Sequence, residues 1–405
     1  MDTFSNRVLH WLESMRVGLG RYRMSASSDS SLFTSCFALY IYDLLGETRS
    51  WSSEKKGHWI DLINASQDAD SGYFLPEWNA VPLDGKPVHQ LTSFCLSALE
   101  LLGGEPRYGL RFLSTWQNKK DIHDYLLAKG CADGVRGSGN AAMFVAIFLT
   151  YHYEKTGESH SLDLLDAWFD FHDEHQNSSG FWGRDRSSHH FHGVQNGFHQ
   201  LLVYFYWNRD VARSEHIVDA VLAIQDRDGF YSPTPGGDGC HDLDSISILT
   251  NITSTTGHRP AEVKRSLMNA HLALLGTQQD DGGFCQSKMM PTNLMRLARC
   301  LPRLARPVPL PVSYYRLRKS IGIAIRGQKT TTTSNWTTIP RAWTDSNLWD
   351  TWFRCLGLAL TEDALDLDQN ARLFTPHFQS FVGLGFHERR NITASAPRGG
   401  AIPFL

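Results

Sequence analysis

The chain has no excess of charge of either sign and no long apolar run. Among its 405 residues, 39 basic side chains nearly balance 42 acidic ones, for a formal net charge of −3. A net charge this small produces no electrostatic field that would attract the phosphate backbone of a nucleic acid. We therefore expect no nucleic-acid partner. No stretch approaches the roughly 20 apolar residues that cross a bilayer. Asp2, Glu13 and Arg16 interrupt the first 23 residues, so we expect no transmembrane segment, signal peptide or anchor.

Paired cysteines and alternating strands are also missing. The seven cysteines are scattered and form no Cys-x-x-Cys pair, which is typical of reduced thiols rather than of a disulfide framework. We therefore expect a cytoplasmic protein. No segment shows the period-two alternation of a half-buried strand. Aromatic residues, by contrast, make up 12% of the chain, enough for a thick core or for a cavity walled by rings.

The strongest pattern that is present is an internal repeat. Four turns share a glutamine, then Asp or Ser, then glycine, then an aromatic residue. They begin at Gln67, Gln176, Gln225 and Gln279. Gln117 and Gln328 fall where degenerate copies are expected, and the six glutamines are separated by 50, 59, 49, 54 and 49 residues. The spacing indicates about six units of about 50 residues each.

Each unit also contains helical runs, with apolar residues at three- and four-residue spacing. Before the turns, these runs cover residues 58–65, 108–116, 162–172, 214–224 and 263–275. After the turns, they cover residues 91–102, 141–151, 194–206, 243–252, 294–304 and 348–360. Two helices per unit, closed into a ring, predict an all-α fold, an α/α toroid (barrel) of about six helical hairpins. We expect residues 1–405 to form this single domain, with a less regular C-terminal segment from about residue 363.

In such a ring, the equivalent ends of the inner helices lie at one height around a common axis. Polar side chains occupy these ends in every unit, with aromatic side chains beside them. Their convergence in one concave space is the usual arrangement of an active site, although the aromatic members could equally pack the toroid. The residues predicted to surround a ligand are His89, Trp182, His192, Tyr231, Cys240, Phe284, Asn293, Trp349 and Asp350.

One inner helix opens with two aspartates, Asp242 and Asp244. Asp242 could serve only as a cap or first-turn residue, which the helix dipole favours. A cap needs no second carboxylate two positions on, where Asp244 points about 200° away around the helix. In a dry, aromatic cavity, desolvation and the Asp242 charge would both raise the pKa of Asp244. A carboxylic acid that keeps its proton at pH 7 can protonate a carbon–carbon double bond or a leaving oxygen.

These patterns resemble those of the terpene cyclase and protein prenyltransferase toroid superfamily. The four turns are similar to its Gln/Trp repeats, and the segment from Asp242 to Ser245 resembles the Asp-x-Asp-Asp acid motif of class II terpene cyclases. Ser245 stands in place of the last aspartate. The resemblance implies Asp244 as the proton donor, Asp242 as its neighbour and His241 as a hydrogen-bond partner. It implies an enzyme, an isomerase or lyase, that cyclises an isoprenoid in a central cavity. No cofactor is expected, although a diphosphate substrate could bring Mg²⁺.

Three alternatives use the same residues. Asp238 and Cys240 resemble the Asp-x-Cys zinc pair of protein prenyltransferase β subunits, but the third position offers Asp350 in place of a histidine. A cysteine with two carboxylates is an unpromising zinc set, so we predict no metal. A glycan-processing α/α-barrel enzyme would use the Asp/His cluster for acid/base work on a sugar. A non-catalytic toroid would bind a small molecule, and Asp242 would then only cap its helix. The oligomeric state is left open.

Overall fold

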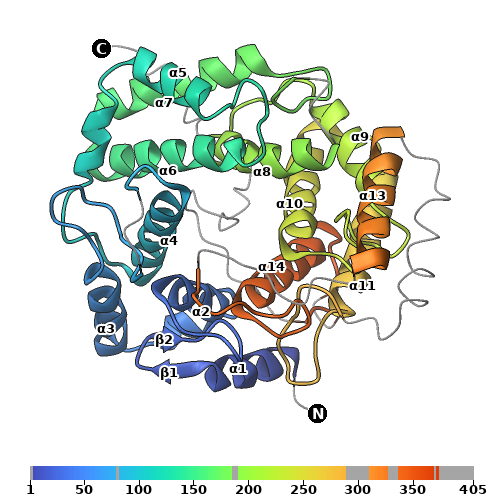
Figure 1. Ribbon diagram of the computed structural model, residues 1–405, viewed down its shortest axis with the longest axis horizontal. Helices are drawn as coiled ribbons and strands as arrows, with labels where there is room; N and C mark the ends of the chain where they lie inside the picture. Colours follow the sequence, from blue (N-terminus) through green and yellow to red (C-terminus); the bar gives the residue numbers. More distant parts are fainter. Residues whose placement is uncertain are drawn as a thin grey trace.

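The computed structural model describes residues 3–78, 82–184, 190–288, 310–326, 336–368 and 371–373. Six helices of these segments contact one another in order, and the last returns to the first. They are α2 (Leu32–Leu44), α4 (Lys86–Leu102), α6 (Ser138–Thr156), α8 (His190–Tyr206), α10 (Gly239–Thr256) and α14 (Leu348–Ala364). Figure 1 shows the closed ring that they form. The all-α class and the α/α toroid are confirmed.

A second set of helices lies outside this inner ring (Figure 1). These are α3 (Ser53–Asn64), α5 (Lys119–Ala128), α7 (Ser159–His175), α9 (Ser214–Ile224) and α11 (Pro260–Leu275). Burial distinguishes the two sets, because α2 buries every one of its residues whereas α3 buries only Trp59, Ile63 and Asn64. A helix packed on all sides needs apolar residues all round, and an outer helix needs only one apolar stripe. Outer and inner helices alternate along the chain, as the repeat predicts.

The remaining described elements lie at the edges of the ring. The helix α1 (Phe4–Ser14) is followed by a small antiparallel pair, β1 (Arg16–Gly18) and β2 (Arg21–Tyr22). The short 3₁₀ helix η1 (Glu47–Ser50) follows α2, and α13 (Leu310–Arg326) contacts α8. None of the helices in the described segments is both long and apolar enough to cross a membrane.

The second unit departs from its predicted helix. Residues 108–116 do not form a helix throughout, because they contain only the 3₁₀ helix η2 (Arg111–Thr115), and α5 begins after Asn118. The Asn118 side chain accepts from the backbone N–H of Asp121 at 3.2 Å, and Asp121 accepts from that of Asn118 at 3.1 Å. This capping box fixes the start of α5. The repeat pattern also does not predict α2, which precedes the first Gln turn.

Some predictions fall outside the described residues. These are the helical run at 294–304, the copy at Gln328 and the C-terminal segment beyond residue 373.

The repeated glutamines join successive hairpins. Gln225 is buried, and its Nε2 donates to the carbonyl of Gly229 in its own turn at 3.0 Å and to that of Ser266 on α11 at 2.7 Å. Gln67 and Gln176 make the same two kinds of bond, to a glycine of their own turn and to a residue of the next unit. Their acceptors are the carbonyls of Gly72 and Tyr108 and those of Gly180 and Ala212. The amide therefore satisfies two backbone carbonyls at once.

The fourth turn corrects the predicted register by one residue. Gln278, not Gln279, donates to the carbonyl of its turn glycine, Gly282, at 3.1 Å. The Gln279 side chain instead contacts the thiol of Cys285. Two consecutive glutamines at this place made the sequence ambiguous.

Replacing Gln225 by alanine is expected to lower the free energy of unfolding by about 2–3 kcal/mol, because two hydrogen bonds are lost and two buried carbonyls lose their donor. Gln117 provides the matched control, since its exposed side chain makes only a 3.5 Å contact with the Ser114 carbonyl. Gln117→Ala should change stability by no more than about 0.5 kcal/mol. Urea denaturation of both variants measures the difference, and equal effects would contradict the linking role.

Candidate active site in the ring

The helix α10 begins with a pair of opposite charges. Asp238 is its N-cap and accepts from the backbone N–H of His241 at 2.9 Å. The His241 Nδ1 lies 3.0 and 2.9 Å from the two oxygens of the same carboxylate. Burial alone would raise the pKa of Asp238 and lower that of His241. The pairing overcomes burial at both residues, so the pKa of Asp238 is lowered and the pKa of His241 is raised. His241 thus pairs with Asp238, whereas the sequence predicted it as a partner of the acid.

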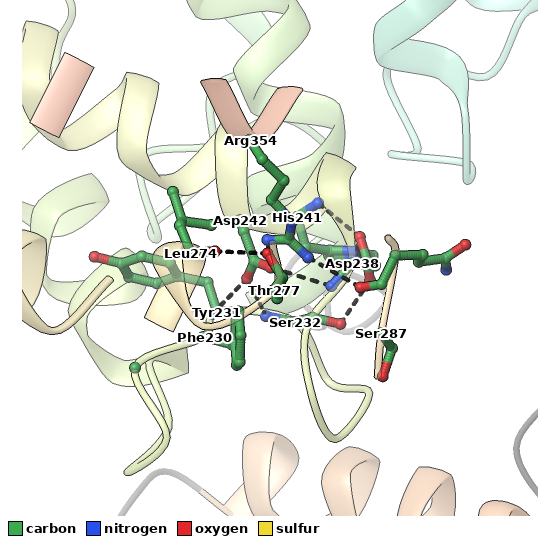
Figure 2. A network of polar contacts seen from close by, with 12 residues as sticks. Phe230, Tyr231, Ser232, Asp238, His241, Asp242, Leu274, Thr277, Ser287 and Arg354 are labelled. Carbon is green, nitrogen blue, oxygen red and sulfur yellow. Dashed lines mark hydrogen bonds and ion pairs between the residues drawn. The ribbon is translucent and has the colours of Figure 1, made fainter. Parts of the chain in front are cut away.

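Asp242 anchors a loop rather than capping the helix. Its Oδ1 accepts from the backbone N–H groups of Tyr231 at 2.8 Å and Ser232 at 3.1 Å. Its Oδ2 accepts from the N–H of Asp238 at 3.1 Å and from Nη1 of Arg354 at 2.6 Å (Figure 2). Burial raises the pKa of Asp242, and the Arg354 guanidinium opposes that rise. Because all four partners are donors, the ionised carboxylate is the form that this environment matches.

Two glycines allow this close packing. A Cβ on Gly237, whose φ is +88°, would lie 2.7 Å from Oδ2 of Asp242. A Cβ on Gly239 would lie 2.6 Å from Oδ1 of Asp350 on the neighbouring inner helix. The loop and the start of α10 can therefore approach the two carboxylates only with glycine at these places.

Arg354 is the functional candidate that the sequence analysis missed. It lies on α14, is 1% exposed, and also donates to the carbonyl of Gln286 at 3.0 Å. A signal was present, because an arginine within the apolar run 348–360 has to find a buried partner. The sequence could not identify that partner, since Asp242 lies 112 residues away along the chain.

Asp244 has a different environment from Asp242. It is 1% exposed, and within the described part of the chain its Oδ2 has no hydrogen-bond partner. Burial raises its pKa well above the ordinary value, and the charges of Asp238 and Asp242 add to the rise. The raised pKa favours the protonated, neutral form of Asp244. The hydroxyl of Ser245, which replaces the last motif aspartate, donates to the carbonyl of His241 at 2.8 Å.

Asp244 shares one face of α10 with Cys240. Cys240 lies one helical turn earlier on the same face and is partly exposed. Burial is the largest cause of the raised pKa of the Cys240 thiol, and the charges of Asp244, Asp238 and Asp350 raise it further. Lys86, at the start of α4 on the other side of the inner ring (Figure 1), is also within electrostatic range of Cys240.

Aromatic side chains form a cluster near the start of α14. The ring of Trp349, on α14, lies with its centroid 4.2 Å from that of Trp336, 5.0 Å from that of Phe37 and 6.3 Å from that of Phe94. The Trp349 indole also lies beside the thiol of Cys240. Residues of α2, α4 and α14 thus form one aromatic cluster next to the face that carries the acid.

Three other predicted aromatic residues occupy packing positions. The Trp182 indole donates to the carbonyl of His172 on α7 at 2.7 Å. The Tyr231 hydroxyl lies 2.7 Å from the hydroxyl of Ser266 on α11. Phe284 is fully buried, and its backbone N–H bonds to a side chain of α14. These positions between helices favour the packing interpretation over a place beside the acid.

The predicted histidines lie at the starts of two other inner helices. His89 Nε2 is 3.1 Å from the hydroxyl of Tyr73, and burial lowers the pKa of His89 to about 4. His192 Nε2 is 3.3 Å from the hydroxyl of Tyr315 on α13. Asn293 lies outside the described residues.

Asp350, near the start of α14, bonds to residues close to it in the sequence. It accepts from Nδ2 of Asn347 at 2.7 Å and pairs with Nη2 of Arg341 at 3.3 Å. Among the residues that the structure describes, no three His, Cys, Asp or Glu side chains are arranged to hold a metal ion. The alternative metal set of Asp238, Cys240 and Asp350 is therefore not assembled.

The raised pKa of Asp244 predicts a pH dependence of stability. Between the ordinary Asp pKa of about 3.9 and the raised value, the folded chain holds a proton that the unfolded chain releases. Stability must then fall as pH rises, by about 1.4 kcal/mol per pH unit for this group. Asp244→Asn removes the contribution. Urea titrations at a series of pH values give the unfolding free energies of the wild type and of the variant. Above about pH 4, the difference between the two (wild type minus variant) should fall with this slope as pH rises. A flat difference would contradict a protonated Asp244.

Comparison with known proteins shows no family for this chain. No family model matches the chain, and no curated protein matches it. Similar solved structures include a polysaccharide lyase, with 12% identity over 90% of this chain and 97% of that chain and a TM-score of 0.48. The type II terpene cyclase MstE from Scytonema has 13% identity over 89% and 98%, with a TM-score of 0.47. A glycosyl hydrolase family 88 structure from Bacteroides vulgatus has 12% identity over 90% and 98%, with a TM-score of 0.47. Values this low carry no conclusion about function.

Proposed function

We propose that this protein is an enzyme in which Asp244 protonates an isoprenoid and starts its cyclisation, as in class II terpene cyclases. The observation that carries the proposal is the environment of Asp244, a buried acid with a raised pKa whose Oδ2 has no hydrogen-bond partner among the described residues. A carboxylic acid that gives its proton to no protein group can give it to a substrate.

The chemistry follows from the surroundings of the acid. Asp244 transfers its proton to one carbon of a double bond, and the electron pair of that bond forms the new C–H bond. The cation that remains on the other carbon is attacked by the next double bond, which closes a ring. Loss of another proton ends the reaction, so the product is an isomer of the substrate. The aromatic cluster around Trp349 could stabilise the cation by about 0.5–2 kcal/mol per ring.

Asp238 and Asp242 would act on the acid without donating protons. Each carries a negative charge near Asp244, and these charges disfavour the ionisation of Asp244. Each is itself stabilised by a cation, His241 for Asp238 and Arg354 for Asp242. Their role in this proposal is to keep Asp244 protonated and to hold the loop against α10.

A second candidate is a glycan-processing enzyme in which Asp244 protonates a leaving oxygen. It is favoured by the polar pocket that Lys86, His89 and Asn140 line where α4 and α6 begin. Such a lining suits the hydroxyl groups of a sugar better than a hydrocarbon.

Incubation with prenyl diphosphates, and separately with oligosaccharides, tests the proposal. The products are identified by liquid chromatography and mass spectrometry. An isoprenoid product of unchanged mass but new retention time is the expected result. Cleavage of a glycan with no change in any isoprenoid would overturn the proposal in favour of the second candidate.

A further inference from the structure

A pocket of about 190 Å³ lies where α4 and α6 begin and α5 ends. Its wall carries three cationic side chains, Lys86, Lys129 and Arg136, and one carboxylate, Asp84. Lys129 pairs with Asp84, at 3.6 Å between Nζ and Oδ2. Lys86 and Arg136 form no ion pair with any residue of the described segments. Among the described residues, therefore, no ion pair compensates these two positive charges of the pocket.

Two buried polar side chains also line this pocket. Asn140 is 8% exposed and Ser138 is 4% exposed. In the described part of the chain, neither side chain has a hydrogen-bond partner. The polar atoms of these two side chains are not among the buried, unpaired ones of the described residues, so at the pocket wall a ligand or solvent can bond them.

The starts of two helices add to the positive potential. α4 and α6 begin after Gly85 and Gly137, and neither glycine can offer a side chain as a cap. Asn196 accepts from the N–H groups of Gly137 and Gly139, but its amide is neutral. The positive ends of both helix dipoles therefore lie at the pocket, where the one carboxylate of the lining, Asp84, already pairs with Lys129.

We propose that this pocket binds an oxyanion group of the ligand, of the phosphate or diphosphate class, through Lys86, Arg136, Asn140 and Ser138. The guanidinium of Arg136 and the ammonium of Lys86 supply charge-assisted hydrogen bonds, and the Asn140 amide and the Ser138 hydroxyl supply neutral ones.

The position of Lys86 links this pocket to the acid. Lys86 is within electrostatic range of Cys240, which lies one helical turn from Asp244 on α10, and of His199 on α8. Burial lowers the pKa of Lys86, and a bound anion would restore it. One molecule could then hold its anionic group at Lys86 and its reacting carbon at Asp244. This last step rests on the proposed function, whereas anion binding does not.

Calorimetric titration of the wild-type protein with inorganic pyrophosphate tests the pocket, with sodium glucuronate as a carboxylate probe. Saturable pyrophosphate binding that weakens as salt is added is expected. Lys86→Met and Asn140→Asp should each weaken it by about tenfold or more. Lys120→Met is the matched control, because it removes the same charge from an α5 side chain that is 79% exposed and outside the pocket. This control should change the affinity by less than about twofold.

The other outcomes are decisive as well. No saturable binding, or equal affinities for the Lys86 and Lys120 variants, would overturn the proposal. Binding of glucuronate but not pyrophosphate would overturn the phosphate class. The Asp244→Asn protein should bind pyrophosphate like the wild type, so the pocket can stand even if the acid role of Asp244 fails.

Discussion

Asp244→Asn is expected to reduce turnover by at least about 10³-fold, within the range that general acid catalysis contributes. The side-chain amide has the shape of the protonated acid but cannot transfer a proton to carbon. Because the raised pKa favours the neutral form of Asp244 in the folded chain, we expect the substitution to remove no charge that the fold depends on. The thermal midpoint at pH 7 should therefore not fall. Product formation from the substrate found in the panel measures the effect.

A matched control separates loss of the acid from loss of charge in general. Asp124 lies on the outer helix α5, where its side chain is 57% exposed and pairs with Lys120. Asp124→Asn makes the same chemical change away from the ring interior and should keep wild-type turnover. Wild-type turnover by Asp244→Asn would refute the assigned role.

Arg354→Met is expected to lower the free energy of unfolding by about 3–5 kcal/mol. The substitution leaves the Asp242 carboxylate buried with three backbone donors and no cation. The loop of residues 231–238 would lose its connection to α14. Chemical denaturation of the purified variant measures the loss.

An exposed ion pair provides the comparison for Arg354. Arg21 and Glu77 form a pair at 3.2 Å with side chains 50% and 36% exposed. Arg21→Met should cost no more than about 1 kcal/mol. A loss for Arg354→Met as small as that for Arg21→Met would show that Asp242 does not depend on its buried partner.

The toroid could be predicted because its repeat has a physical cause. A glutamine that bonds two carbonyls recurs at three of the places where one hairpin meets the next, at Gln67, Gln176 and Gln225. The prediction was wrong where this cause was absent or ambiguous. The helix α2 has no such turn before it, and the start of α5 is set by the local capping box at Asn118.

The site could be predicted only in part. Helix geometry alone separates Asp242 from Asp244, and the two side chains indeed have different surroundings: those of Asp242 are rich in donors, and Oδ2 of Asp244 has no partner among the described residues. Their partners come from distant segments, so the role of Arg354 could not be read from the motif. Nor does any motif contain Lys86 or Arg136, which meet only because α4 and α6 are neighbours in the ring.

The most direct test of the account is the protonation state of Asp244. Infrared difference spectroscopy at pH 7, wild type minus Asp244→Asn, detects the carbonyl stretch of a single carboxylic acid. A carboxylic acid band present in the wild type and absent from the variant is the result that we predict. A difference spectrum that contains only the bands of an ionised carboxylate would contradict it.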